Sequence, residues 1–244
     1  MTTTIQVGTL DLRNALTAVL PHAGTDADYP DLSRVRLTLS AKHVFALASD
    51  RYTAALALVS TWEYDGPEYE IVELVPDDAG KLLRVFKAPG KESGDSPQYM
   101  LRIEVDSDEI TVTDCSGFDF GGHQLRLPRL DTAPTLGGAA TLFARAHAGQ
   151  IMLLDAATRM IVTGKNLARF NKAAATYDEP LMLETRSGET RQKAAVLIRC
   201  GEDFLGLIVP RPLDEDEARE AREWVEGWTA RLPDLAAAAG GESG

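Results

Sequence analysis

Residues 43–62 read HVFALASDRYTAALALVSTW, two apolar runs that a short polar turn separates. The runs cover 43–49 and 53–62, and their alternating or continuous apolar residues are typical of β-strands. The turn consists of Asp50, Arg51 and Tyr52, and Asp50 is better explained as a loop carboxylate than as a general base. The stretch therefore predicts a strand–turn–strand unit in the first third of the chain.

Helices and strands are predicted in groups on both sides of this unit. The apolar residues of 11–20 and of 77–87 recur at helical spacing, and Pro89 and Gly90 end the second helix. Further strands are predicted at 34–40, 70–75, 98–106, 109–114 and 118–127. The order helix, strands, helix, strands indicates the α+β class.

The proline- and glycine-containing segment LPRLDTAPTLGG (127–138) predicts a linker between two domains. After it the pattern partly repeats, with only 16 residues (149–164) between two predicted helices against 56 (21–76) in the first domain. The helices of the repeat are expected at 139–148 and 165–176, and its strands at 150–154, 159–163, 180–186, 193–200 and 203–210. We therefore expect a complete domain at 1–137, a shortened one at 138–213, and an acidic helical tail with a disordered end at 214–244.

Composition excludes several classes of protein. The 25 basic and 37 acidic residues give a net charge of −12, which argues against a protein that coats nucleic acid with its whole surface. Only two cysteines are present, so a disulfide-rich scaffold and a multi-cysteine zinc site are excluded. The first residues, MTTTIQVG, do not resemble a signal peptide, and we expect a cytoplasmic protein.

Two predicted helices nevertheless keep basic residues on the side opposite their apolar stripes. Leu82 and Phe86 belong to the stripe of 77–87, and Phe170 and Tyr177 to that of 165–176. The residues on the opposite sides are Lys81, Arg84 and Lys87 on the first helix, and Lys165, Arg169 and Lys172 on the second. Two interpretations stay open: an ordinary solvated helix face, or a surface that meets the phosphates of a polyanion.

No motif for catalysis, cofactors or metal was found. GKN at 164–166 lacks the leading glycine and the Ser or Thr of a phosphate-binding loop. GFDFGG at 117–122 lacks the dinucleotide spacing, and the four histidines share no metal-ligand spacing. Cys115 and Cys200 lie in strand-like runs and are interpreted as small buried side chains. We therefore expect no enzyme activity, no metal and no cofactor.

Four segments in this order resemble the bacterial DNA polymerase III sliding clamp (beta subunit) family. ALASDRYTAALALV (46–59) is similar to its strand–turn–strand unit, and VELVPDDAGKLLRVFK (72–87) to the strand and helix that follow. LPRLDTAPTL (127–136) is similar to its domain-ending segment, and GLIVPRPL (206–213) to its closing strand. The resemblance covers 1–137 and about 158–213.

The resemblance implies the DNA-clamp fold, in which βαβββ half-domains place antiparallel sheets outside and helices on the inner face. It implies a processivity factor that encircles duplex DNA without reading sequence and holds polymerase and clamp-loader peptides in a pocket. The implied DNA-contacting residues are Arg13, Lys81, Arg84, Lys87, Lys165, Arg169 and Lys172. The implied pocket residues are Ser49, Arg51, Tyr52, Ala54, Pro134, Val209, Pro210 and Leu213.

The chain departs from the family in length and at its end. Family members carry three domains and close a ring of six domains as a dimer, so a chain with two domains would need a trimer. The second domain lacks roughly 40 residues of its first half, and the chain continues past Leu213 into a tail with Trp224 and Trp228. An alternative function is therefore a monomeric clamp-fold module that binds replication-protein peptides, or modulates a host clamp, without encircling DNA.

Overall fold

The computed structural model describes residues 2–88, 99–116, 122–151, 160–186 and 195–240. The chain forms two compact units. The first comprises Met1–Leu153 and Val162–Pro210, and the second comprises Leu154–Ile161 and Arg211–Gly244. Parts of the strands expected at 98–106, 118–127, 150–154, 159–163 and 193–200 lie outside the described residues.

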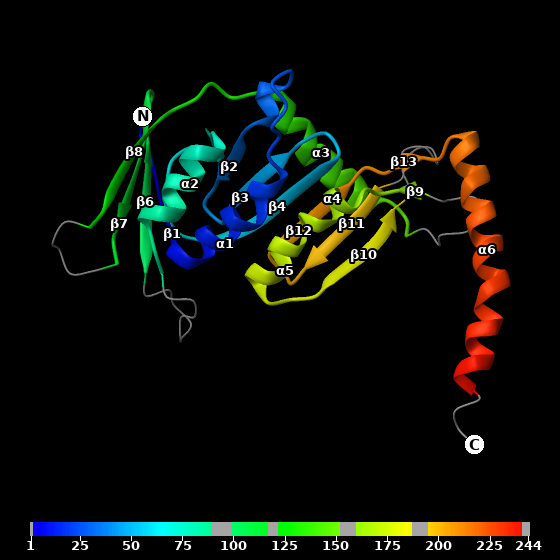
Figure 1. Cartoon of the computed structure of the whole chain (residues 1–244). Helices are drawn as coiled ribbons and strands as arrows, with labels where there is room; N and C mark the ends of the chain where they lie inside the picture. Colours follow the sequence, from blue (N-terminus) through cyan, green and yellow to red (C-terminus); the bar gives the residue numbers. More distant parts are fainter. Residues whose placement is uncertain (1, 89–98, 117–121, 152–159, 187–194, 241–244) are drawn as a thin grey trace. The chain divides into compact units, whose positions relative to one another are not determined.

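The first 128 residues repeat one order of elements twice (Figure 1). The first copy is β1 (Thr3–Gly8), α1 (Thr9–Val19), β2 (Val35–Leu39), β3 (His43–Ser49) and β4 (Thr53–Asp65). The second copy is β5 (Glu70–Leu74), α2 (Pro76–Val85), β6 (Met100–Val105), β7 (Glu109–Asp114) and β8 (Gln124–Pro128). Both copies read βαβββ, the half-domain that the sequence resemblance implied.

The rest of the first unit holds one helix and a shortened third copy. The helix is α3 (Pro134–Ala148), and the third copy comprises α4 (Gly164–Ala168), α5 (Asn171–Tyr177), β10 (Leu181–Arg186), β11 (Ala195–Cys200) and β12 (Phe204–Ile208). The second unit contains β9 (Met160–Ile161), which pairs with β13 (Arg211–Pro212), and α6 (Glu215–Gly240). Helix α6 includes part of the alanine-rich end that was expected to be disordered.

A single antiparallel sheet connects the three copies, in the order β10-β11-β12-β4-β1-β6-β7-β8. Strand β4 is the junction, because its first residues pair with β12 and its last residues pair with β1. Thr53 lies opposite Ile208, and Asp65 lies opposite Thr4. Strand β3 pairs with β4 along the other edge of β4, and β2 and β5 extend the sheet from there.

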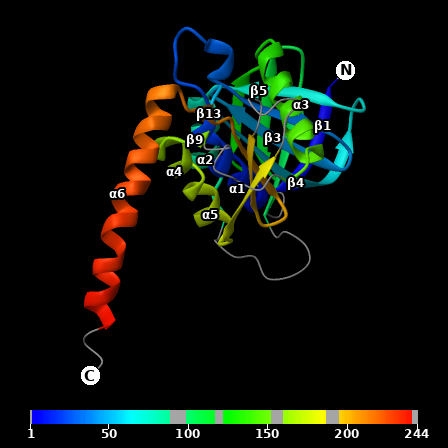
Figure 2. The same ribbon diagram turned by 90° about the vertical axis from the view of Figure 1, so that its right-hand side faces the viewer.

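Helices cover both faces of the sheet in the first unit (Figures 1 and 2). Helix α1 contacts both α2 and α5, so these three form one layer. On that face, the ring of Phe170 lies against Phe204 and Gly206 of β12. Helix α3 lies on the opposite face, where Phe143 packs in a cluster with Leu207 of β12.

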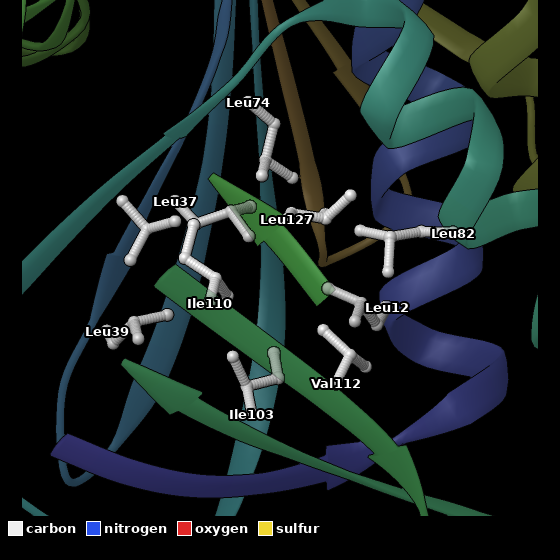
Figure 3. Close-up of a pocket in the computed structure, with 10 residues that line it drawn as sticks. Leu12, Leu37, Leu39, Leu74, Leu82, Ile103, Ile110, Val112 and Leu127 are labelled. Atoms are coloured by element: carbon white, nitrogen blue, oxygen red, sulfur yellow. The ribbon is translucent and has the colours of Figure 1, made fainter. Parts of the chain in front are cut away.

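The core beneath α1 and α2 is closely packed. Side chains from α1, α2 and strands of both βαβββ copies converge on a cavity of about 10 Å³ (Figure 3). Its lining is wholly aliphatic: Leu12, Leu37, Leu39, Val72, Leu74, Leu82, Ile103, Ile110, Val112 and Leu127. A space of this size, with no polar group to hold a water, is a packing defect and not a ligand site.

Three elements differ from the sequence prediction. Strand β1 was not predicted, although Thr3, Ile5 and Val7 of its residues are buried in alternation. Helix α3 begins at Pro134, inside the predicted linker, because proline is favoured at a helix start. The helix expected at 165–176 is broken into α4 and α5, so Leu167 is exposed while Phe170 and Ala173 are buried.

A buried ion cluster ties the start of α3 to the sheet. The Glu73 carboxylate on β5 is fully buried and pairs with the guanidinium groups of Arg36 at 2.8 Å and Arg34 at 2.9 Å. It also accepts a hydrogen bond of 3.0 Å from the Ala133 amide, while Arg36 donates to the Ala133 carbonyl. The cluster thus satisfies the backbone of Ala133, immediately before the first residue of α3.

We expect Glu73→Ala to lower the free energy of unfolding by about 3–5 kcal/mol, because it leaves Arg36 buried without a counterion. The exposed pair of Arg126 and Glu109, 3.6 Å apart, supplies the control. Glu109→Ala should change the free energy by no more than about 1 kcal/mol in the same urea titration. Equal effects of the two substitutions would contradict a structural role for the cluster.

Candidate functional site

The turn between β3 and β4 is held by the carboxylate of Asp50. One of its oxygens accepts hydrogen bonds from the amides of Tyr52 at 3.1 Å and Thr53 at 2.8 Å, and from the Thr53 hydroxyl at 3.0 Å. Arg51 has a φ of 83°, a conformation that costs free energy in residues other than glycine. Asp50 is therefore a turn carboxylate, as its position after a strand predicted, and it stabilises an unusual backbone.

Arg169, at the break between α4 and α5, holds the other oxygen of Asp50. Its guanidinium pairs with that oxygen and donates to the Thr53 hydroxyl at 2.9 Å. The Arg169 side chain is 18% exposed and that of Asp50 is 11% exposed, so the pair is partly shielded from water. The contact joins residues 119 positions apart, which is why helical spacing alone placed Arg169 with the surface cations.

His22 extends this cluster into the core. It is fully buried, with Nδ1 3.1 Å from the Thr53 hydroxyl and its ring centroid 4.5 Å from that of Phe170. Burial, followed by the nearby Arg169 charge, lowers the pKa of His22 to about 3, against an opposing effect of Asp50. His22 is therefore neutral at pH 7.

The pKa of Asp50 is also lowered. Burial by itself would raise this pKa, but the hydrogen bonds from the Thr53 amide and from Arg169 outweigh it. Asp50 is consequently ionised at every pH near neutrality, and its attraction to Arg169 persists there.

Exposed aromatic and apolar side chains surround the turn. The Arg51 guanidinium lies 4.1 Å from the ring centroid of Tyr29, and Tyr52 is 56% exposed. The Val209 amide donates to the Tyr52 carbonyl at 2.9 Å, which brings the end of β12 beside the turn. We call Tyr29, Arg51, Tyr52 and Val209 the turn surface.

The residues implied for a peptide pocket fall into three groups. Arg51, Tyr52, Val209 and Pro134 are exposed. Ser49, Ala54 and Pro210 are buried. Leu213 belongs to the second unit. A role for any of them in peptide binding stays a prediction.

Tyr29 was missed by the sequence interpretation. It precedes a short 3-10 helix, Pro30–Leu32, in a loop whose composition gives no sign of its contact with Arg51. The same short helix contacts the start of α3, where the Thr135 hydroxyl donates to Asp31 at 3.3 Å. Pro134 therefore lies on the helix turn that borders the loop of Tyr29.

The seven residues implied for DNA contact fall into two groups, those bound by other parts of the protein and those exposed to solvent. Arg13 of α1 donates to the carbonyls of Leu83 at 2.5 Å and of Phe86, at the end of α2. Arg13 and Arg169 are thus occupied by contacts within the protein. The exposed remainder, which we call the basic helix face, consists of Lys81, Arg84, Lys87, Lys165 and Lys172.

The residues of the basic helix face lie on α2 and just after its end, on α4 and on α5. Lys81 pairs with Asp78 at 2.7 Å but keeps half of its side chain exposed. Within the described residues, Arg84, Lys87, Lys165 and Lys172 form no salt bridge. Such cations can neutralise phosphates without fixing a ligand in one register.

The fold matches solved bacterial clamps over most of the chain. The DNA polymerase III beta subunit from Thermotoga maritima superposes with a TM-score of 0.59 at 12% identity, covering 87% of this chain and 65% of that one. The DNA polymerase sliding clamp from Bacillus subtilis gives 0.53 at 12% identity, covering 86% and 64%. The chain has the fold of the bacterial sliding clamps. The resemblance seen in the sequence is confirmed at this level.

A third clamp, the DNA polymerase III subunit beta from Pseudomonas aeruginosa bound to griselimycin, matches with a TM-score of 0.54 at 12% identity. The match covers 88% of this chain and 66% of the Pseudomonas aeruginosa subunit. No protein-family model matches the sequence, and no curated protein does. The clamp-like chain thus spans about two thirds of the solved clamps.

Within the part of the chain that the structure describes, no three His, Cys, Asp or Glu side chains are grouped so that they could hold a metal ion. None of the described helices is long and apolar enough to cross a membrane. Cys200 is buried and Cys115 is half-buried. Burial, followed by the charge of Glu179, raises the pKa of the Cys200 thiol, which opposes a role as a nucleophile.

The neutral state of buried His22 predicts a pH dependence. The unfolded chain takes up a proton on His22 below its ordinary pKa of 6.5, whereas the folded chain does so only near 3. Stability should therefore fall as the pH is lowered from 6.5 towards 4, by up to about 1.4 kcal/mol per pH unit from this residue.

We expect His22→Asn to flatten this slope, as measured by urea titrations at pH 7, 6, 5 and 4. Asp50 does not contribute in this window, because its stabilisation is lost only as the pH falls through its lowered folded pKa. An equal slope in wild type and variant would show that His22 is not buried in neutral form.

Proposed function

We propose that this chain is a clamp-like DNA polymerase processivity factor. It acts by binding, without catalysis: the turn surface holds a peptide of a polymerase or clamp loader, and the basic helix face meets duplex DNA. The shared fold with sliding clamps of DNA polymerase supports the proposal. We expect the protein to work in the cytoplasm, where replication takes place in bacteria.

The proposal that the chain binds a peptide is based on one observation: the β3–β4 turn lies beside the end of β12. The hydrogen bond of 2.9 Å from Val209 to Tyr52 joins segments that lie far apart in the sequence. Around it stand two exposed tyrosines and an exposed valine, beside the guanidinium of Arg51. Rigid aromatic side chains with a polar neighbour suit a short peptide anchor.

The separation of charges on the protein supports the proposal that the basic helix face binds DNA. The protein has a net charge of −12, yet four of the five exposed cations of the basic helix face lie on α2, α4 and α5, and Lys87 follows directly after α2. Contacts to phosphate alone carry no sequence information, so a protein held by them can slide along DNA. The rest of the protein carries a net negative charge, which disfavours binding of DNA elsewhere on the surface.

Encirclement requires several copies. Each copy of this chain contributes two domains if its shortened second domain is counted. Three copies therefore supply six domains, the number in the ring of a bacterial clamp. Strands β8 and β10 lie at the two ends of the sheet order. Such end strands offer unpaired backbone groups. Pairing of β8 with β10 of the next copy is the contact that we propose for the ring.

Reversal of charge on the basic helix face tests the DNA contact. We expect Arg84→Glu with Lys172→Glu to weaken binding of duplex DNA and to reduce the slope of log K against log salt by about 2. The charge-matched control is Lys42→Glu with Arg145→Glu, both exposed, with Arg145 on α3 across the sheet. If both pairs of substitutions weaken binding equally, the helix face does not contact DNA.

Griselimycin, bound by the clamp from Pseudomonas aeruginosa, is the probe for the turn surface. We expect the wild-type protein to bind it in a calorimetric titration, and Tyr52→Ala to weaken binding by about 1–2 kcal/mol through loss of an aromatic anchor. Tyr69→Ala removes a tyrosine of similar exposure, 58% against 56%, outside the turn surface, and should leave binding unchanged. Absence of binding by the wild type contradicts the proposed peptide site.

A further inference from the structure

Helix α6 is a long helix with a well-defined start. Asp214 and Glu217 form a reciprocal capping box, in which the Glu217 amide donates to Asp214 at 2.9 Å and the Asp214 amide donates to Glu217 at 3.0 Å. Arg211 also pairs with the Glu217 carboxylate. These contacts, led by the Arg211 hydrogen bond, lower the pKa of Glu217 to about 2.

The apolar residues of α6 follow a heptad repeat. Spacings of three and four residues alternate along the stripe, which is the pattern of positions a and d in a coiled coil. The stripe consists of Ala218, Ala221, Val225, Trp228, Leu232, Leu235 and Ala239. Its three large described members are exposed: Val225 by 39%, Trp228 by 43% and Leu232 by 50%.

The charged residues of α6 avoid this stripe. Most of its acids lie at the outer positions b, c and f: Asp216, Glu220, Glu223, Glu226 and Asp234. On the outer side, Arg219 pairs with Asp216 at 2.7 Å. The positions flanking the stripe carry Glu217 at g and Arg222 at e. In a parallel pair of helices, position g of one helix faces the next e of its partner, so opposite charges meet.

An unpartnered helix with this composition is only marginally stable in water. Gly227 and Pro233 both lie in its interior and oppose helix formation. The ring of Trp224 contacts that of Trp228, with centroids 6.2 Å apart, which leaves two large apolar groups at the surface of one helix. Pairing along the stripe would remove this apolar surface from water.

We propose that α6 pairs with α6 of a second copy of this chain as a parallel, in-register, two-stranded coiled coil. Glu217 of each helix then lies near Arg222 of the other. In an antiparallel pair, e positions face e positions and g positions face g positions, so Glu217 and Arg222 do not meet and this attraction is lost. The pairing is independent of the proposed function, since it uses neither the turn surface nor the basic helix face.

Disulfide cross-linking of the full chain tests the pairing and its direction. Position 221 is a d position, so Ala221→Cys brings two cysteines together across a parallel interface. Glu220→Cys places the thiol at an outer c position and is the matched control. Wild type, with Cys115 and Cys200, sets the background. We expect mild oxidation to link Ala221→Cys several-fold more than the control or the wild type.

A second pair of variants tests the same interface by mass. Val225→Glu puts a charge into the stripe, whereas Ala230→Glu adds it at an outer f position. Light scattering should show that Val225→Glu halves the mass of the assembly and that Ala230→Glu does not, with an unchanged urea unfolding transition of the first unit confirming that both fold. Equal cross-linking at positions 220 and 221, or equal masses of the two glutamate variants, overturns the proposal.

Discussion

The contact between Asp50 and Arg169 is the constraint that joins the turn surface to the helix layer that carries the basic helix face. One oxygen of Asp50 is occupied by three donors from its own turn, and the other is held by a guanidinium 119 residues away. The turn carries a residue at positive φ, so its backbone needs this support. Arg169 also lies at the break that sends Phe170 into the core, so one ion pair joins the β3–β4 turn and the helix layer.

The two faces of the sheet differ in the helices that cover them and in the charges that those helices carry. The face of α1, α2 and α5 carries exposed cations, while the face covered by α3 is tied to the sheet through the buried Glu73 cluster. Under the proposed function, sliding needs weak, uniform contacts with phosphates, and a peptide site needs rigid anchors. The exposed ends of Lys and Arg side chains suit the first requirement, and tyrosines beside a hydrogen-bonded turn suit the second.

The sequence predicts the local elements well, because their periodicity is set by burial on one face. Strands β3 and β7 have the predicted bounds, and Leu82 and Phe86 are buried as the stripe of α2 required. The site was predicted less well, because its geometry depends on contacts between distant residues. Arg13 and Arg169 have the spacing of surface cations, yet both are engaged by partners 70 or more residues away. Helical spacing cannot reveal such a partner.

A double-mutant cycle on Asp50 and Arg169 tests most directly whether this ion pair holds the β3–β4 turn in the shape that the proposed peptide site needs. The measurements are the free energy of unfolding and the affinity for griselimycin of the wild type, Asp50→Asn, Arg169→Met and the double variant. We expect both quantities to show a coupling of about 1–3 kcal/mol, because either substitution alone leaves a partly buried polar group without its partner. Additive effects in both would show that the turn holds its shape without Arg169, and would contradict the link between the turn surface and the helix layer.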